Sequence, residues 1–154
     1  MSSSDQQFDF ILYGATSFVG QIIAAYLAGY TSEEYTWAIA GRSERKLQEL
    51  KQRFNLNDIP HFVADASDEK TLKVLCEKTK AVVSTVGPYA LYGETLVKVC
   101  AQSGTDYCDL TGEPQWIKQM LEKYEADAKS SGARIVHCTG FDSIPSDLGV
   151  YKLQ

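Results

Sequence analysis

Residues 8–27 read FDFILYGATSFVGQIIAAYL, and this stretch decides the fold. The apolar run from Phe8 to Tyr13 is typical of a strand that is buried on both faces. Gly14 ends the run, and small residues follow it. Beyond them the apolar residues recur at helical spacing, which predicts a helix that packs one stripe on a sheet. That stripe consists of Val19, Ile22, Ile23, Tyr26 and Leu27.

The turn between Gly14 and Gly20 lies at the N-terminus of the predicted helix. Backbone N–H groups there are unpaired and the helix dipole is positive, so a pyrophosphate can approach the backbone. Gly14 suits a sharp turn, and Gly20 allows close contact between helix and strand. The order of strand, turn and helix is that of a dinucleotide-binding βαβ unit. Because the spacing is GxxxxxG and not GxGxxG, these residues alone leave an ordinary strand-to-helix turn as the alternative. The pattern also excludes a GxxxxGK[ST] phosphate loop, since Val19, Gly20 and Gln21 occupy its positions.

Composition narrows the class of partner. The chain has 154 residues, of which 44% are hydrophobic, enough for one domain with a real core. Its formal net charge is −5, and charges of both signs are interspersed. Nucleic-acid binding needs clustered Lys and Arg, so we expect a small-molecule partner and no nucleic acid.

Cysteine spacing and hydropathy argue against several other classes. Cys76, Cys100, Cys108 and Cys138 form no CxxC pair, so no zinc or other metal site is predicted and we expect buried, reduced thiols. No apolar run reaches the length of a membrane span, and the first seven residues, MSSSDQQ, are polar. A cytoplasmic location is the default expectation.

Strands and helices alternate along the rest of the chain. We predict further strands at 35–42, 61–64, 80–86, 107–110 and 134–138. One helix is predicted at 44–54, with Ser43 as its N-cap, and a second begins after Ser67 as its cap and carries Leu72, Val74 and Leu75. A third follows the loop 87–93 and carries Leu96, Val97 and Cys100. A fourth is predicted at 114–131, with Pro114 in its first turn and Gly132 just past its end. This alternation predicts a Rossmann-type, doubly wound parallel sheet with helices on both faces.

Ligands of such sheets bind outside the carboxyl ends of the strands, where we expect the loops 14–19, 41–43, 65–67 and 87–92 to converge. An NAD site normally has an acidic residue at the end of the second strand. This chain has Gly41, Arg42 and Ser43 there. A guanidinium suits bidentate phosphate binding, so Arg42 predicts NADP in preference to NAD.

Other polar residues are candidates for the adenosine end. The Ser43 hydroxyl can add a contact, whereas Arg45 and Lys46 supply further positive charge or simply belong to a solvated helix face. Asp65 is a candidate for the adenine amino group, with a helix-preceding polar residue as the equal alternative. The predicted cofactor-binding residues are Gly14, Ala15, Thr16, Ser17, Phe18, Val19, Gly20, Arg42, Ser43, Asp65, Thr85, Val86, Gly87 and Pro88.

The sequence assigns no catalytic residue. Packing is favoured over proton donation for Tyr89 and Tyr92, although both can face the cleft. No Tyr and Lys stand at the i, i+4 spacing of a short-chain-dehydrogenase site. His61 and His137 lie in or beside buried strands, which favours a core role for both.

Four segments together resemble a known family. They are GATSFVG (14–20), AGRS (40–43), STVGPYALYGETLVKVCAQSGTDYCDLTGEP (84–114) and TGFDSIPSDLG (139–149). They resemble the N-terminal domain of the saccharopine dehydrogenase-like oxidoreductases, a family that includes proteins similar to trans-acting enoyl reductases. The resemblance implies an NADP- or NAD-binding domain and hydride transfer to or from a small-molecule or lipid substrate. Ser17 departs from the family pattern, which usually has glycine there, and it implies either weaker binding or an extra phosphate donor.

The resemblance also implies a second, larger substrate domain after residue 149. We therefore expect residues 1–154 to be the cofactor domain and a fragment of a longer two-domain protein, inactive alone. The segment from Ser143 reads as the start of a helix with nothing to pack against. A dinucleotide-sensing or protein-interaction module without catalysis is the alternative, a structural domain without nucleotide is a third, and a homo-oligomer is left open.

Overall fold

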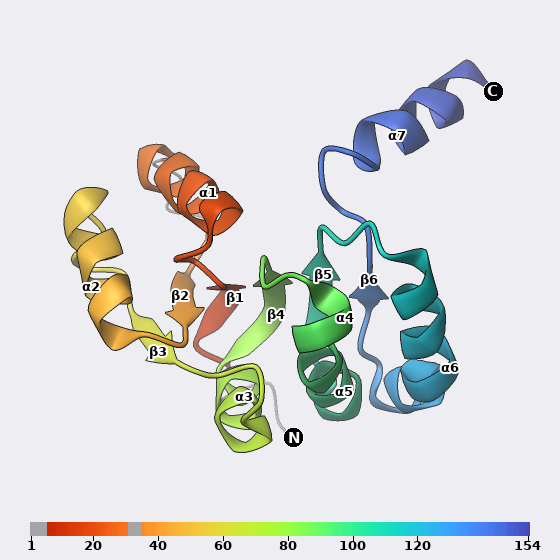
Figure 1. Cartoon of the computed structure of the whole chain (residues 1–154), viewed down its shortest axis with the longest axis horizontal. Coiled ribbons are helices and arrows are strands. Elements are labelled where there is room, and N and C mark those ends of the chain that lie inside the picture. Colours follow the sequence, from red (N-terminus) through yellow and green to blue (C-terminus); the bar gives the residue numbers. More distant parts are fainter. Residues whose placement is uncertain (1–5, 31–34) are drawn as a thin grey trace.

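A computed structural model describes residues 6–30 and 35–154 of the chain (Figure 1). Six parallel strands form one sheet in the order β3-β2-β1-β4-β5-β6. The strands are β1 (Phe8–Tyr13), β2 (Trp37–Gly41), β3 (His61–Val63), β4 (Thr79–Ser84), β5 (Asp106–Asp109) and β6 (Ile135–Val136). The helices are α1 (Phe18–Gly29), α2 (Glu44–Arg53), α3 (Glu69–Glu77), α4 (Tyr89–Tyr92), α5 (Glu94–Ser103), α6 (Pro114–Ser131) and α7 (Ile144–Leu153). The predicted doubly wound sheet is confirmed.

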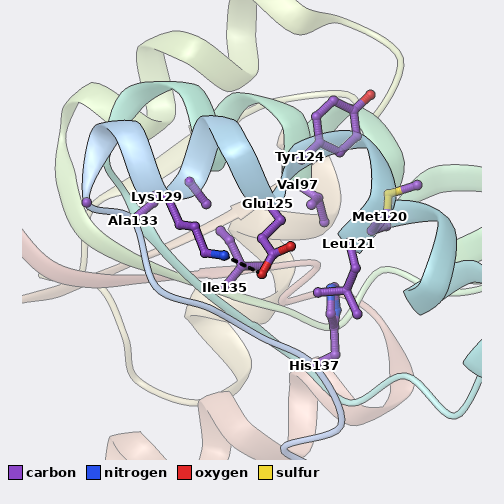
Figure 2. Close-up of a pocket in the computed structure, with 11 residues that line it drawn as sticks. Val97, Met120, Leu121, Tyr124, Glu125, Lys129, Ala133, Ile135 and His137 are labelled. Carbon is purple, nitrogen blue, oxygen red and sulfur yellow. Dashed lines mark ion pairs between the residues drawn. The ribbon is translucent and has the colours of Figure 1, made fainter.

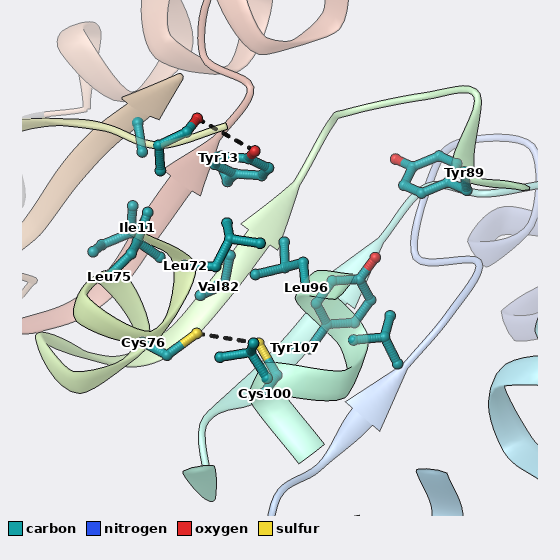
Figure 3. Close-up of a cluster of buried hydrophobic side chains, with 14 of the residues drawn as sticks. Ile11, Tyr13, Leu72, Leu75, Cys76, Val82, Tyr89, Leu96, Cys100 and Tyr107 are labelled. Atoms are coloured by element: carbon teal, nitrogen blue, oxygen red, sulfur yellow. Dashed lines mark hydrogen bonds between the residues drawn. The ribbon is translucent and has the colours of Figure 1, made fainter. Parts of the chain in front are cut away.

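Two apolar clusters pack on opposite faces of the sheet. The larger joins side chains of α3, α5 and α6 to one face and includes Ile11, Val82 and Tyr107 (Figure 3). The smaller joins α1 and α2 to the other face around Leu12 and Ile39. The strand order reverses at β1, because β2 and β3 are added on one side of it and β4, β5 and β6 on the other. The loops after β1 and β4 therefore flank the switch point, where ligands of such sheets bind.

The predicted apolar stripe of α1 is wrong in part. Gly20 and Ala24 are the buried residues of this helix, whereas Ile22 and Tyr26 are 55% and 68% exposed. The reason is a close approach of the helix to β1. A Cβ on Gly20 would lie 2.2 Å from the Gly14 carbonyl oxygen, so the small-residue side of the helix must face the sheet.

Two local predictions near the third strand need correction. Asp68, not Ser67, caps α3, because its carboxylate accepts from the backbone N–H of Lys70 and of Thr71. The Ser67 hydroxyl instead donates to Asp65 Oδ1 at 2.7 Å. Leu72 and Leu75 are buried as predicted, but Val74 is exposed.

The predicted loop 87–93 contains the short helix α4. Glu113 caps it from another part of the chain, since its carboxylate accepts from the Tyr89 N–H at 2.7 Å and from the Ala90 N–H at 3.0 Å. No local pattern reveals such a cap, because donor and acceptor stand more than 20 residues apart. The bounds of α6 and the left-handed Gly132 after it match the prediction.

The expected burial of the cysteine thiols is confirmed for two of the four. Within residues 6–30 and 35–154, no helix has the length and hydropathy of a bilayer span. The same residues contain no cluster of His, Cys, Asp and Glu that could hold a metal ion. All four cysteines are free: Cys76 and Cys100 are buried with their sulfurs 3.6 Å apart, but Cys108 and Cys138 are only half-buried.

Candidate functional site

A cavity of about 390 Å³ opens at the carboxyl ends of β1, β2 and β4. Segments of all four predicted loops contribute to its wall. It is lined by Tyr13, Gly14, Thr16, Ser17, Gly41, Arg42, Ser43, Lys46, Asp65, Ala66, Ser67, Thr85, Val86, Gly87 and Tyr92. Nine of the predicted cofactor residues are in this wall, and the other five are not: Ala15, Phe18, Val19, Gly20 and Pro88.

The turn before α1 offers unpaired donors. The Gly14 and Ala15 N–H groups donate to Ala40 O, and the Ser17 N–H donates to Gly14 O at 2.8 Å. Within the described residues, the N–H groups of Thr16, Phe18 and Val19 have no acceptor. Donors of this kind at a helix N-terminus are the usual partners of a phosphate. Of the three residues, only Thr16 lines the cavity.

Two glycines make this turn possible. Gly14 has a φ of +84°, and a Cβ there would lie 2.6 Å from Val86 Cγ2. Because Gly20 has no Cβ, the first turn of α1 can lie against the backbone of Gly14 and Ala15. The predicted roles of both residues, a sharp turn and a close helix-to-strand contact, are therefore confirmed.

The Ser17 hydroxyl makes two hydrogen bonds inside the protein, one as acceptor and one as donor. It accepts from the Gly20 N–H at 3.0 Å and lies 3.0 Å from Thr85 Oγ1. Thr85 Oγ1 lies 2.9 Å from the Gly14 carbonyl oxygen, which can only accept, so Thr85 donates there and Ser17 donates to Thr85. Ser17 has an ordinary extended backbone with φ −70°, and it serves as the N-cap of α1. This arrangement favours a capping role over that of an extra phosphate donor.

We expect Ser17→Ala to lower the free energy of unfolding by about 1 kcal/mol, the usual value of a lost N-cap. Urea denaturation of the two proteins measures the change. The control is Ser43→Ala, which removes the cap of α2, where the hydroxyl accepts from the Lys46 N–H over a longer 3.4 Å. A smaller loss is expected there. An unchanged stability of Ser17→Ala would contradict the capping role.

Arg42 follows β2 directly, and its exposed side chain lines the cavity without a salt bridge to any described residue. Of the two further basic candidates, Lys46 lines the cavity, whereas Arg45 points to Glu49 on its own helix. Asp65 Oδ1 accepts from the Ser67 hydroxyl and N–H, and these bonds, with the Arg42 charge, lower the pKa of Asp65. The acidic side chain is thus ionised beside the guanidinium.

The two tyrosines of the loop 87–93 differ. Tyr89 is buried, its hydroxyl donates to Ser84 O at 2.9 Å, and burial raises its pKa to about 12. Tyr89 also packs on Trp116, so the packing interpretation is confirmed for it. Tyr92 is 47% exposed and lines the cavity.

Sequence reasoning missed a buried network around Asp109. Asp109 Oδ2 accepts from the Tyr107 hydroxyl at 2.9 Å and lies 2.7 Å from His137 Nδ1. Its Oδ1 accepts from the N–H groups of Thr111 and Cys138, each at 3.1 Å. A single side chain therefore fastens the end of β5 to the segment after β6. The signal in the sequence was a carboxylate inside a strand that is otherwise buried.

The two histidines have different surroundings. The His137 side chain is 7% exposed and packs on Trp116, which confirms the expected core position. His61 lies on the edge strand β3, where its Nε2 is 2.9 Å from Glu44 Oε1, so it is a half-buried edge residue and not part of the core.

A second cavity, of about 310 Å³, runs between α6 and β6 (Figure 2). Its wall is mostly apolar, with Met120, Leu121 and Ile135, and the Glu125–Lys129 ion pair, 2.8 Å long, lies along its α6 side. It shares no lining residue with the first cavity. The candidate site is therefore the cavity at the switch point, where the unpaired donors and Arg42 lie.

Comparison with known sequences agrees with this geometry. The sequence model of one protein family, described as the saccharopine dehydrogenase NADP binding domain, matches residues 10–136. The chain belongs to this family. The match covers the turn between Gly14 and Gly20, Arg42 and the loop 87–93, so these 154 residues contain the NADP-binding domain of the saccharopine dehydrogenase family.

Curated relatives of this family member are longer than the chain. A putative trans-acting enoyl reductase of Mycobacterium tuberculosis is 44% identical over 155 residues, which are 99% of this chain and 37% of the relative. A trans-acting enoyl reductase of Mycobacterium leprae is 43% identical over the same share. The chain thus spans little more than a third of the length of these relatives.

Solved structures confirm the fold. Saccharopine dehydrogenase (L-Glu forming) from Saccharomyces cerevisiae superposes with a TM-score of 0.75 at 21% identity, over 94% of this chain and 30% of the other. Triphenylmethane reductase from Citrobacter sp., solved with NADP(H), has a TM-score of 0.61 at 12% identity, over 83% and 48% of the two chains. At these identities the likeness concerns the fold alone.

Proposed function

We propose that this domain holds NADP(H) in the switch-point cavity and serves a reductase of which it is the cofactor part. The observation that carries the proposal is that one cavity joins a turn with three unpaired N–H groups to an unpaired guanidinium. The turn would bind the pyrophosphate, and the segment after β4 would run beside the dinucleotide toward the nicotinamide. The ligand residues we propose are those predicted from the sequence, with Lys46 added.

The adenosine end favours a 2′-phosphate. No carboxylate follows β2 directly, so the usual acceptor for the ribose hydroxyls of NAD is missing from that position. Arg42 and Lys46 line the same wall and can bind a phosphate between them. Asp65 lies on the loop after β3, and its Oδ1 accepts from the Ser67 hydroxyl and N–H, so it does not supply the missing ribose acceptor after β2. It stays among the proposed ligands as the partner of the adenine amino group.

We expect Arg42→Ala to weaken NADPH binding roughly 10- to 150-fold and to leave NADH binding nearly unchanged. The lost charged hydrogen-bonding contact is worth about 1.5–3 kcal/mol. Calorimetric titration of the domain with each dinucleotide measures both affinities. Arg45→Ala is the matched control, because Arg45 has the same charge, belongs to the same segment and points to Glu49. Equal losses for NADPH and NADH, or none for NADPH, would contradict the phosphate contact.

The reaction we propose is hydride transfer between the nicotinamide and a small-molecule or lipid substrate that a further domain binds. The relatives named as enoyl reductases, which extend well beyond the matched span, support this assignment. Substrate-dependent oxidation of NADPH by the longer protein tests it. The second candidate, a dinucleotide sensor, is favoured by one observation: the cavity wall in the described residues holds no histidine or cysteine that could move a proton. Tight NADPH binding without turnover of enoyl or imine substrates would support the sensor.

A further inference from the structure

The turn between β1 and α1 is attached to the sheet differently on its two sides. On the side of β2 the attachment is backbone to backbone, because the Gly14 and Ala15 N–H groups both donate to Ala40 O. On the side of β4, which pairs with β1 (Figure 1), backbone pairing ends where the Thr85 N–H donates to Tyr13 O at 2.9 Å. Within the described residues, no backbone hydrogen bond joins residues 14–17 to β4 or to the segment after it. The turn is therefore attached to β4 by side chains.

The Thr85 hydroxyl makes this attachment. Its oxygen lies 2.9 Å from the Gly14 carbonyl oxygen, 3.2 Å from the Tyr13 carbonyl oxygen and 3.0 Å from the Ser17 hydroxyl. Carbonyl oxygens only accept, so the proton of Thr85 is directed at them and Thr85 accepts from Ser17. Ser17 in turn accepts from the Gly20 N–H at 3.0 Å. The hydrogen bonds therefore run from the end of β4 through the turn into the first turn of α1.

Thr85 also packs closely against the turn. The residue is 7% exposed, so water has little access to its hydroxyl. A Cβ on Gly14 would lie 2.7 Å from Thr85 Oγ1 and 2.6 Å from Val86 Cγ2, which means that the end of β4 fills the space beside Gly14. Loss of one partner from a buried hydrogen bond leaves the other without an acceptor or donor, and this is more costly than at the surface.

We propose that Thr85 is a positioning residue, whose hydroxyl fixes the phosphate-binding turn to the end of β4 and does not itself bind the dinucleotide. The inference rests on the proposed function and narrows the role of Thr85 in it. The residue lines the cavity, but its N–H and its O–H both donate to carbonyl oxygens. The groups that it positions are the unpaired N–H groups of Thr16, Phe18 and Val19, which stand next to Ser17 in the chain. A fixed turn holds these donors in place before the cofactor arrives, so binding does not have to order them.

Thr79 provides a matched control on the same strand. It stands at the start of β4, is fully buried, and its hydroxyl also donates to carbonyl oxygens, with Phe8 O at 3.2 Å and Ala81 O at 2.9 Å. Valine removes either hydroxyl while nearly keeping the shape of the side chain. We expect Thr85→Val to weaken NADPH binding about tenfold, and Thr79→Val to leave it unchanged. Thr85→Ser keeps the hydroxyl and is expected to bind NADPH within about twofold of the unaltered protein.

Calorimetric titration of the 154-residue chain measures these affinities. Equal NADPH affinities of Thr85→Val and the unaltered protein would overturn the proposal, and so would equal losses in the two valine variants. Failure of Thr85→Ser to restore binding would overturn it as well, because the methyl group and not the hydroxyl would then be the part that matters.

A double variant distinguishes positioning from direct contact with the cofactor. Because Thr85 acts through Ser17, the fold-losses of NADPH affinity in Ser17→Ala and Thr85→Val are expected to combine to less than their product. A hydroxyl that donated to the pyrophosphate would instead give losses that multiply, and that result would refute the positioning role. Adenosine 2′-monophosphate carries the 2′-phosphate without the pyrophosphate, so all of these variants should bind it as the unaltered protein does. A loss of its binding in Thr85→Val would contradict an effect confined to the turn.

Amide hydrogen exchange without cofactor separates this inference from the proposed function. The Ser17 and Gly20 N–H groups donate within the turn, to Gly14 O at 2.8 Å and to the Ser17 hydroxyl at 3.0 Å. We expect both amides to exchange about tenfold faster in Thr85→Val than in Thr79→Val. Faster exchange in a protein that does not bind NADPH would refute the cofactor role and leave the fixing of the turn by Thr85 intact. Normal NADPH binding with unchanged exchange would refute only the role of Thr85.

Discussion

Gly20→Ala is expected to lower the free energy of unfolding by about 3 kcal/mol and to abolish NADPH binding at ordinary concentrations. The added Cβ would lie 2.2 Å from the Gly14 carbonyl oxygen and 2.9 Å from the Cα and carbonyl carbon of Ala15. All three are backbone atoms, so no side-chain rotation relieves the clash. Helix α1 must move away from β1, and the N–H groups of the turn lose their common direction.

The control is Gly29→Ala at the other end of the same helix. A Cβ there meets nothing within 4 Å, so alanine is expected to leave the stability unchanged or raise it by up to about 1 kcal/mol. Urea denaturation gives the stability of each variant, and calorimetric titration gives its NADPH affinity. If Gly20→Ala folded as stably as Gly29→Ala, the close contact between α1 and β1 would be disproved.

Asp109→Asn is the second substitution with a large expected effect, a loss of about 3 kcal/mol of stability. The carboxylate oxygens face four donors, namely the Tyr107 hydroxyl, the imidazole and two backbone N–H groups. An amide has one acceptor oxygen, and its NH₂ group would meet two of those donors. Each buried donor left without an acceptor costs about 1–3 kcal/mol.

Asp106→Asn on the same strand is the matched control. The Asp106 carboxylate pairs with Arg134, whose side chain is 81% exposed, so the expected cost is about 1 kcal/mol or less. Thermal unfolding compares the two variants, and amide hydrogen exchange of Cys138 and Thr139 reports whether the segment after β6 has come loose. Full protection of these amides in Asp109→Asn would show that the network does not hold that segment.

The sequence predicted the sheet and the cavity because both depend on local patterns. Gly14 and Arg42 each follow a strand directly, and parallel strands bring their carboxyl ends to one edge. The predicted apolar stripe of α1 also rested on a local pattern, and that prediction was wrong in part. Periodicity ranks residues by hydropathy, but the closeness required at Gly20 decides which side of the helix reaches the sheet.

The parts that sequence reasoning missed depend on contacts between distant segments. Asp109 meets His137 28 residues later, and only the pairing of β5 with β6 brings them together. The sequence predicted a core position for His137, and its burial confirms that position. No local pattern predicted its hydrogen-bond partner, Asp109. The same holds for the short helix α4, whose cap comes from Glu113.

The Glu113 cap makes residue 113 and the segment 87–93 depend on each other, so we expect them to evolve together. Without that carboxylate the Tyr89 and Ala90 N–H groups lose their acceptors, and without α4 the carboxylate has no partner. A lineage that alters one stretch is therefore under selection to alter the other. Among homologues we expect residue 113 and residues 87–93 to vary together, so an insertion in the loop should be accompanied by replacement of the glutamate.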